Sequence, residues 1–268
     1  MKQVIDLLKK ITKENYIELT SRGNTAIFSV LYCARKINPK KIVLIPDQGG
    51  WFTYKRYPFY LELRIEQVKT NYGIIDLKDL KKKIKNANCL LYSNPAGYFA
   101  EQPVKEIYNI CRDKCLVILD VSGSIGLKDY SKYCDFMIGS FGIDKPVNLG
   151  YGGFIGTNNK NNFEIPKEIF NLTIFEDKYY KPLLQKLKNL KIRYQYYNKI
   201  NKKIKKDLKK YDIIHRNKEG INVAVKFKDN KEKENLIEYC KKHKYPFRIC
   251  PFYIRVKAKA ISIEVKRL

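Results

Sequence analysis

Short apolar runs alternate with amphipathic stretches over the first 160 or so residues of the chain. The apolar runs are rich in branched side chains, as is typical of buried strands, and they predict strands over residues 42–45, 63–65, 89–92, 116–119, 136–138 and 154–155. Between them, apolar residues recur at helical spacing and predict helices over 25–35, 77–84 and 104–111. This alternation indicates an α/β fold with a parallel or mixed sheet.

The pattern changes near residue 170, where a long Lys-rich amphipathic stretch begins and continues to about residue 210. Its apolar residues follow a helical period, at Leu183, Leu184, Leu187, Leu190, Tyr194 and Tyr197. The last fifty or so residues predict a small α+β unit, with strands over 221–227, 253–256 and 260–265 and a helix over 231–242. We therefore expect a major α/β domain over 1–165, followed by a long helix and a small domain over 166–268.

The chain carries 54 Lys and Arg against 27 Asp and Glu, a formal net charge of +27. A charge of this size attracts nucleic acid, anionic lipid or phosphorylated substrates. Abundant Lys, Ile, Asn and Tyr are also what a low-GC genome produces, so compositional bias is the competing explanation. Charge runs such as 202–206 are usually the solvated face of a helix, and the sequence alone does not favour a polyanionic partner.

Several classes of function are disfavoured by what the sequence lacks. No apolar run approaches the roughly 20 residues that span a bilayer, and the first residues lack the apolar core of a signal peptide, so we expect a cytoplasmic protein without a membrane partner. The seven cysteines form no Cys-x-x-Cys pair and predict buried free thiols. Only His215 and His243 are present, both in polar surroundings, so neither a His-based triad nor a metal site is expected.

Lys145 has surroundings that suggest a reactive amine. It follows the apolar run at 136–140 and precedes a glycine-rich turn, Gly150-Tyr-Gly-Gly153, and a second apolar run. We therefore expect it on a tight loop between two strands, where its amine is held rigidly.

Four further features precede Lys145 along the chain. A glycine and small polar residues, Gly23, Asn24 and Thr25, open a predicted helix, where free N–H groups can hold a phosphate or Asn24 or Thr25 can serve as a plain N-cap. Trp51 follows a strand and either stacks on a planar ligand or packs as a core or lid aromatic.

The other two features also come after strands. Asn94 lies in Tyr92-Ser-Asn-Pro-Ala-Gly97, and Asp120 ends an apolar run. A carboxylate there is desolvated and needs a partner, which can be a ligand cation or the N-terminus of the next helix.

In this order, the features resemble fold-type I pyridoxal-phosphate enzymes, most closely the sugar aminotransferase (DegT/DnrJ) family. In that family, Ser-Phe-x-x-x-Lys followed by Gly-x-Gly-Gly carries the Schiff-base lysine, and the matching positions here are Ser140, Phe141, Lys145, Gly150, Gly152 and Gly153. The resemblance implies a three-layer αβα fold with a mostly parallel sheet, pyridoxal 5'-phosphate as cofactor, and a homodimer with active sites at the interface. Reaction partners would be a small-molecule amino donor and a keto acceptor.

The resemblance also implies a role for each matching position. Lys145 would form the Schiff base and move protons at the substrate Cα, Asp120 would pair with the pyridine nitrogen, and Trp51 would stack on the ring. Ser122 would lie near the other ring face, and Asn94 would bind the phenolic oxygen. The phosphate would contact Gly23, Asn24, Thr25 and Ser140, and Asn171 would reach the partner subunit's phosphate.

The chain departs from the family in two ways. Gly123 stands three residues after Asp120, where family members carry Gln or His, and the chain is shorter than typical members. Arg255, and secondly Arg248, are the candidate clamps for a substrate carboxylate, with a solvent-facing strand arginine as the alternative.

Other enzymes on the same scaffold remain alternatives, namely a lyase, a desulfurase or an aminoacyl-tRNA-modifying enzyme. So does a basic nucleic-acid-binding or regulatory protein that retains the fold.

Overall fold

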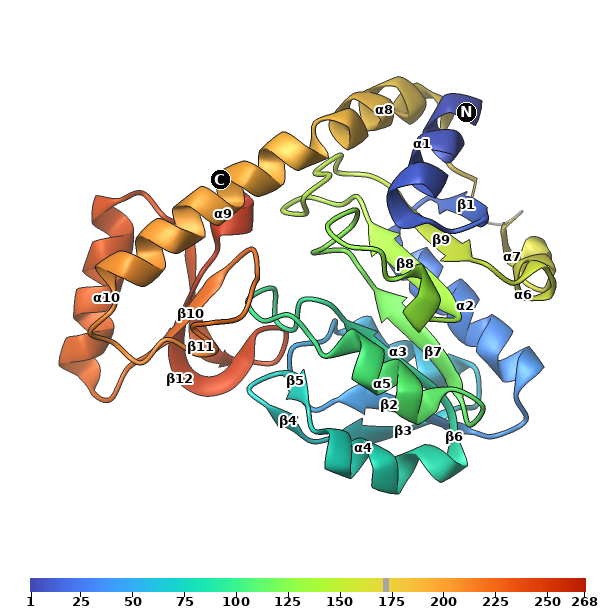
Figure 1. Ribbon diagram of the computed structural model, residues 1–268, viewed down its shortest axis with the longest axis horizontal. Coiled ribbons are helices and arrows are strands. Elements are labelled where there is room, and N and C mark those ends of the chain that lie inside the picture. The colour runs from blue at the N-terminus through green and yellow to red at the C-terminus, as the bar shows by residue number, and fades with distance from the viewer. Residues whose placement is uncertain (171–173) are drawn as a thin grey trace.

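The computed structural model describes residues 1–170 and 174–268, so Asn171 lies outside the described residues. A central sheet contains seven strands in the order β1-β9-β8-β7-β6-β2-β3 (Figure 1). These strands are β1 (Tyr16–Thr20), β2 (Ile42–Pro46), β3 (Arg64–Val68), β6 (Ala87–Ser93), β7 (Leu116–Asp120), β8 (Phe136–Ser140) and β9 (Gly153–Thr157). The strands from β3 to β8 pair in parallel, whereas β9 pairs antiparallel with both β8 and β1.

Helices cover both faces of this sheet, because the side chains of each central strand alternate between two apolar cores. In β6, Leu90 and Tyr92 join one core, while Cys89 and Leu91 join the other. The first core includes α1 (Lys2–Thr12), α4 (Leu77–Lys83) and α5 (Val104–Cys111), and the second includes α2 (Gly23–Ile37) and α3 (Thr53–Tyr60). The expected three-layer αβα fold with a mostly parallel sheet is confirmed.

Shorter elements complete this part of the chain. They are the hairpin of β4 (Thr70–Asn71) and β5 (Ile74–Ile75), and the helices α6 (Lys160–Glu164) and α7 (Lys167–Phe170).

A nearly continuous helical segment then leads to the C-terminal part of the chain. It consists of α8 (Tyr180–Lys188) and α9 (Leu190–Asp207), and Figure 1 shows it running from beside α1 to the C-terminal elements. Leu183, Leu187, Leu190, Tyr194 and Tyr197 are buried, as their helical spacing predicts. In the described part of the chain, no helix is long and apolar enough to cross a membrane.

The C-terminal elements form a three-stranded antiparallel sheet in the order β10-β12-β11, with α10 (Asn230–Lys242) beside it. The strands are β10 (Val223–Lys226), β11 (Phe247–Phe252) and β12 (Val256–Ile263). The strand expected over 253–256 was wrong. Residues 253–255 form the turn between β11 and β12, in which the N–H of Arg255 donates to the carbonyl of Phe252 at 2.9 Å, and Val256 begins β12.

Candidate functional site

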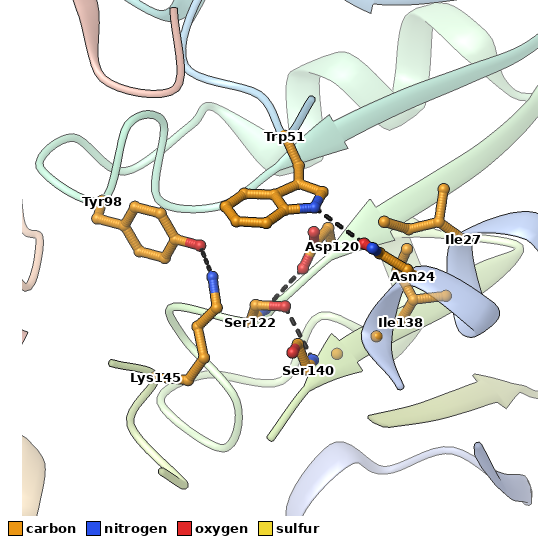
Figure 2. Close-up of a pocket in the computed structure, with 11 residues that line it drawn as sticks. Asn24, Ile27, Trp51, Tyr98, Asp120, Ser122, Ile138, Ser140 and Lys145 are labelled. Carbon is orange, nitrogen blue, oxygen red and sulfur yellow. Dashed lines mark hydrogen bonds between the residues drawn. The ribbon is translucent and has the colours of Figure 1, made fainter. Parts of the chain in front are cut away.

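A cavity opens where β7 and β8 end and α2 begins. The carboxyl ends of parallel strands meet at one edge of the sheet, which brings together residues that are far apart in the sequence. The side chains of Asp120 and Lys145 both reach this cavity, which Figure 2 shows. The residues that line it are Gly23, Asn24, Ile27, Trp51, Tyr98, Asp120, Ser122, Ile138, Gly139, Ser140 and Lys145.

Asp120 ends β7 with its carboxylate fixed by two donors. The hydroxyl of Tyr54 donates to Oδ2 at 2.6 Å, and the N–H of Ser122 donates to Oδ1 at 2.8 Å. Burial, together with the charge of Asp120, raises the pKa of Tyr54 well above its usual value, so the phenol keeps its proton and donates. The buried acid is therefore held in one orientation as an acceptor for a group in the cavity.

The N-terminus of α2 meets the end of β8 at very close range. A Cβ on Gly23 would lie 2.5 Å from Cβ of Ser140, so only glycine fits there. The N-cap residue is Arg22, without a side-chain cap, which removes the alternative that Asn24 or Thr25 is the N-cap. The start of this fifteen-residue helix therefore presents backbone N–H groups and the positive end of its dipole, which suit a phosphate.

Two serines connect this helix start to the acidic end of the cavity. The Oγ of Ser122 accepts a 2.9 Å hydrogen bond from the N–H of Ser140, and the Oγ of Ser140 accepts one of 3.2 Å from the N–H of Gly142. Thr25 is not among the lining residues, and its hydroxyl lies 3.4 Å from that of Ser21.

Trp51 forms one wall of the cavity. Its indole N–H donates a 2.9 Å hydrogen bond to Oδ1 of Asn24, which fixes the ring plane. The Nζ of Lys145 lies 4.7 Å from the ring centroid. The amine of Lys145 therefore lies directly against the aromatic face of Trp51 on the wall of the cavity.

Lys145 lies on a loop that is pinned at several points. The carbonyl of Phe141 accepts from the N–H groups of Leu149 and Gly150, at 2.7 and 3.0 Å. The carbonyl of Asp144 accepts a 2.8 Å bond from Nζ of Lys266. The Lys145 side chain is only 8% exposed, so its amine points into the cavity and not into solvent.

Tyr98 is a site residue that the sequence did not reveal. Its hydroxyl forms a hydrogen bond with Nζ of Lys145 (Figure 2). A Cβ on Gly123 would lie 3.0 Å from the Tyr98 ring and equally close to Pro95, so the ring occupies the space beside that glycine. The hydroxyl of Tyr98 therefore lies in the cavity beside Gly123, which has no side chain of its own.

The two arginines predicted to bind a substrate carboxylate are not among the residues that line the cavity. Arg255 lies close to the cavity, with Cζ 4.8 Å from the centroid of the Tyr98 ring, but it is 4% exposed. Its Nε donates to Glu264 at 2.7 Å, its Nη2 at 2.5 Å, and its Nη1 donates to the carbonyl of Ile254. Arg248 is exposed in β11 and lies against the ring of Phe252. The Arg255 guanidinium is thus already engaged with a carboxylate within the chain.

Lys266 is a second buried lysine beside the site, and no sequence motif singles it out. It is 3% exposed, and its Nζ lies 4.8 Å from the centroid of the Tyr98 ring. Burial, together with the charges of Arg255 and Lys145, lowers the pKa of Lys266 to about 7.

Asn94 was predicted as a ligand of the phenolic oxygen, and the structure does not bring it to the cavity. Its Oδ1 accepts a 2.9 Å bond from the N–H of Gln102, and its Nδ2 lies 3.4 Å from Oγ of Ser124. These bonds direct the amide away from the cavity, toward the opposite side of its loop. The side chain closes a buried turn, which sequence reasoning could not distinguish from ligand binding.

The seven cysteines are free and buried, which confirms the prediction of buried thiols, and no cysteine lines the cavity. Within residues 1–170 and 174–268, no cluster of three or more His, Cys, Asp or Glu side chains could hold a metal ion.

The fold defined by this sheet and its helices is that of fold-type I pyridoxal-phosphate enzymes. NtdA from Bacillus subtilis, solved with pyridoxamine phosphate (PMP), is similar over 100% of this chain and 73% of its own, with a TM-score of 0.80 and 16% identity. L-threonine transaldolase from Pseudomonas fluorescens is similar over 99% of this chain and 66% of its own, with a TM-score of 0.75 and 16% identity.

A third similar structure is a mutant of GDP-4-keto-6-deoxymannose-3-dehydratase (ColD) with bound GDP-perosamine. The similarity covers 98% of this chain and 87% of that one, with a TM-score of 0.73 and 15% identity. In sequence, residues 191–268 match the MJ1341 family C-terminal domain. No curated protein matches the sequence. At identities this low, the structural similarity shows a shared fold alone.

Proposed function

We propose that the cavity binds pyridoxal 5'-phosphate and that the protein is a pyridoxal-phosphate-dependent aminotransferase. The observation that carries this proposal is the convergence of Lys145, Asp120 and the N-terminus of α2 on one small cavity. An amine, a fixed carboxylate and a phosphate-binding helix start are the three groups that such a cofactor requires. The remaining roles follow from where each side chain lies.

The residues present fit the cofactor at each of its functional groups. The start of α2 presents backbone N–H groups beside Ser140, and both Gly23 and Ser140 line the cavity, so phosphate oxygens can accept hydrogen bonds there. The Asp120 carboxylate can accept a hydrogen bond from a pyridinium N–H, since its two present donors fix it without blocking the cavity. The indole face of Trp51 can cover one side of the ring, and Ser122 lies near the other side.

When bound, pyridoxal phosphate supplies an aldehyde that an amine can hold as a Schiff base and a ring that withdraws electrons from the substrate Cα. Lys145 would hold the cofactor at that aldehyde and would move a proton at the substrate Cα as general acid and base. Asp120 would keep the ring nitrogen protonated through its negative charge. Tyr98 would orient the Lys145 amine.

The substrates are a small-molecule amino donor and a keto acceptor, and the sequence resemblance suggests a sugar-linked acceptor. The resemblance likewise suggests a homodimer. Among the alternatives on this scaffold, a desulfurase is the least supported, because all seven cysteines are buried and none lines the cavity.

An optical experiment tests the proposal. The purified protein incubated with pyridoxal phosphate should develop a visible absorbance band that borohydride removes. Lys145→Ala should abolish this band, whereas Lys178→Ala, at an exposed lysine, should leave it unchanged. Addition of an amino donor should then change the visible absorbance band of the wild-type protein. A wild-type protein without the band would refute the cofactor assignment.

A further inference from the structure

A second, much larger cleft lies beneath α9, on the other side of the loop that carries Asn94. It has a volume of about 1080 Å³. Its walls come from α1, from the loops after β6 and β7, from α8 and α9, and from residues 216–221. Asn94 and Ser124, whose side chains face away from the catalytic cavity, line this cleft instead. The molecule therefore has an additional concave surface to which the proposed catalysis assigns no role.

The α8–α9 segment forms a wall of the cleft, to which it contributes apolar side chains, among them Leu187 and Tyr194, and a polar stripe. Its residues recur at alternating intervals of three and four, which places them on one stripe of a helix. They are Lys188, Lys191, Gln195, Asn198, Lys202 and Lys205. From the first to the last, the stripe extends about 26 Å at the helical rise of ~1.5 Å per residue.

The positive charge of this cleft is not neutralised within the described residues. The two carboxylates in its lining, Glu101 and Glu219, both contact Lys128, at 2.8 and 3.5 Å. Across the described ranges, 1–170 and 174–268, no carboxylate lies within salt-bridge distance of Lys188, Lys191 or Lys202, all of which are exposed. An uncompensated row of cations in a concave surface focuses positive potential inside it.

Compositional bias does not account for this row of charges. Residues 178–206 contain eleven Lys and Arg and no Asp or Glu, although the whole chain has two basic residues for each acidic one. In that ratio, about five acidic residues would accompany eleven basic ones. By contrast, α10 carries four lysines and three glutamates within thirteen residues. The segment that borders the cleft is therefore selectively depleted of acids.

The shape of the cleft restricts what the charges can bind. A flat membrane surface cannot enter a concave site. A single phosphate would be held by two or three converging cations, whereas these lysines extend along about 26 Å of helix. A linear polyanion matches them better, since the ~5.4 Å helical pitch is of the same order as the spacing of phosphates along a nucleic-acid strand. Gln195 and Asn198 add amides that can donate to and accept from the strand.

We propose that the cleft beneath α9 binds a single strand of nucleic acid through its phosphate backbone. The strand would follow the stripe from Lys188 to Lys205 and pass the loop after β7, which contains Gly123. Both sites contact this loop. On the cleft side, the hydroxyl of Tyr194 lies 3.4 Å from the carbonyl of Gly123, and on the cavity side the ring of Tyr98 packs against the same glycine. Strand binding does not depend on the proposed cofactor chemistry, and either can fail without the other.

Fluorescence anisotropy with a labelled single-stranded RNA of about 16 nucleotides, the upper range of single-strand sites, tests this proposal. Affinity is measured against salt concentration for wild type and for the triple variant Lys188→Gln, Lys191→Gln and Lys202→Gln. The matched control is Lys81→Gln, Lys82→Gln and Lys85→Gln, which removes the same charge from exposed positions in α4 and in the turn that follows it, far from α8 in Figure 1. A DNA strand of the same sequence is measured in parallel, to show whether the cleft binds RNA, DNA or both.

The wild type should bind with a steep salt dependence. The cleft variant should lose affinity on the order of tenfold and its logarithmic salt slope should fall by about 2, since each contact with a single strand contributes about 0.7. The control should change by less than about threefold. The proposal is overturned if neither strand binds with a steep slope, or if the two triple variants weaken binding equally, because net charge alone would then explain it.

Discussion

The hydroxyl of Tyr54 donates a 2.6 Å hydrogen bond to Oδ2 of Asp120, from a helix 66 residues earlier in the chain. Tyr54 is fully buried, and burial keeps its proton on the phenol. The bond fixes a carboxylate that would otherwise be buried with a single donor, the N–H of Ser122. The position of α3 therefore sets the acidic end of the cavity.

Removal of this hydroxyl should be costly. Tyr54→Phe keeps the ring but deletes the donor, and hydrogen bonds to charged groups contribute about 1.5–3 kcal/mol, so we expect a loss of stability of that order. The affinity for pyridoxal phosphate should also fall about tenfold, because the acid is no longer oriented. Trp51 is the only tryptophan and lines the cavity, so quenching of its fluorescence measures binding directly. Unchanged stability together with unchanged affinity would contradict this role of Tyr54.

Tyr98 should affect catalysis more than cofactor binding. Tyr98→Phe preserves the ring beside Gly123 and removes only the hydroxyl that contacts Lys145. We expect the visible band to form normally while the single-turnover rate with an amino donor falls by about 10²-fold, the lower range for a positioned proton-transfer group. Rapid mixing followed by absorbance gives this rate. A variant as fast as wild type would show that the hydroxyl has no part in orienting the amine.

The contact between Gly23 and Ser140 gives a steric test of the phosphate site. Gly23→Ala introduces a Cβ 2.5 Å from that of Ser140 and should abolish cofactor binding while costing about 1–3 kcal/mol of stability. Adding Ser140→Gly removes the atom that clashes. The double variant should regain stability but bind more weakly than wild type, because it lacks the serine hydroxyl. Thermal unfolding and Trp51 fluorescence report the two effects separately, and tight binding by Gly23→Ala alone would argue against a phosphate here.

The carboxyl of Glu14, which is buried outside the candidate site, should make the stability of the protein depend on pH. It is 2% exposed, and burial raises its pKa from 4.5 to about 8, so the folded state holds a proton that the unfolded state releases above about pH 4.5. Its contribution to stability is therefore complete below pH 4.5 and is lost as the pH rises toward 8. Glu14→Gln should be more stable than wild type at pH 8 by at least about 1 kcal/mol, and less so at pH 5. Urea unfolding at both values checks this, and an advantage that is equal at pH 5 and pH 8 would disprove it.

The sequence predicted the elements whose patterns are local. The branched runs of β2, β6 and β7 and the helical periods of α2 and α5 were sufficient to identify them, and residues 104–111 matched α5 at both ends. The strand expected over 253–256 failed because Tyr253 and Ile254 have strand-like side chains but lie in a turn closed by a backbone hydrogen bond. Side-chain propensity does not report such a bond.

The site was predictable where it follows strand ends and glycines, and unpredictable where it depends on tertiary packing. Lys145, Asp120, Trp51 and Gly23 each stand next to a local signal, and all line the cavity. Tyr54 and Tyr98 are two of 21 tyrosines, and nothing nearby in the sequence sets them apart. Arg255 resembled a substrate clamp because its partner, Glu264, follows the end of β12, nine residues later, and comes beside it only in the folded protein.

The central claim is that Lys145 is the amine that holds the cofactor, and Lys266 is its nearest rival. Lys266 is buried beside the same tyrosine ring, and its pKa of about 7 would make it nucleophilic at neutral pH. Reducing the protein with borohydride in the presence of pyridoxal phosphate, followed by peptide mapping, identifies the modified lysine. We expect one adduct, on the peptide that contains Lys145, and none in Lys145→Ala. An adduct on Lys266, or labelling scattered over many lysines, would contradict it.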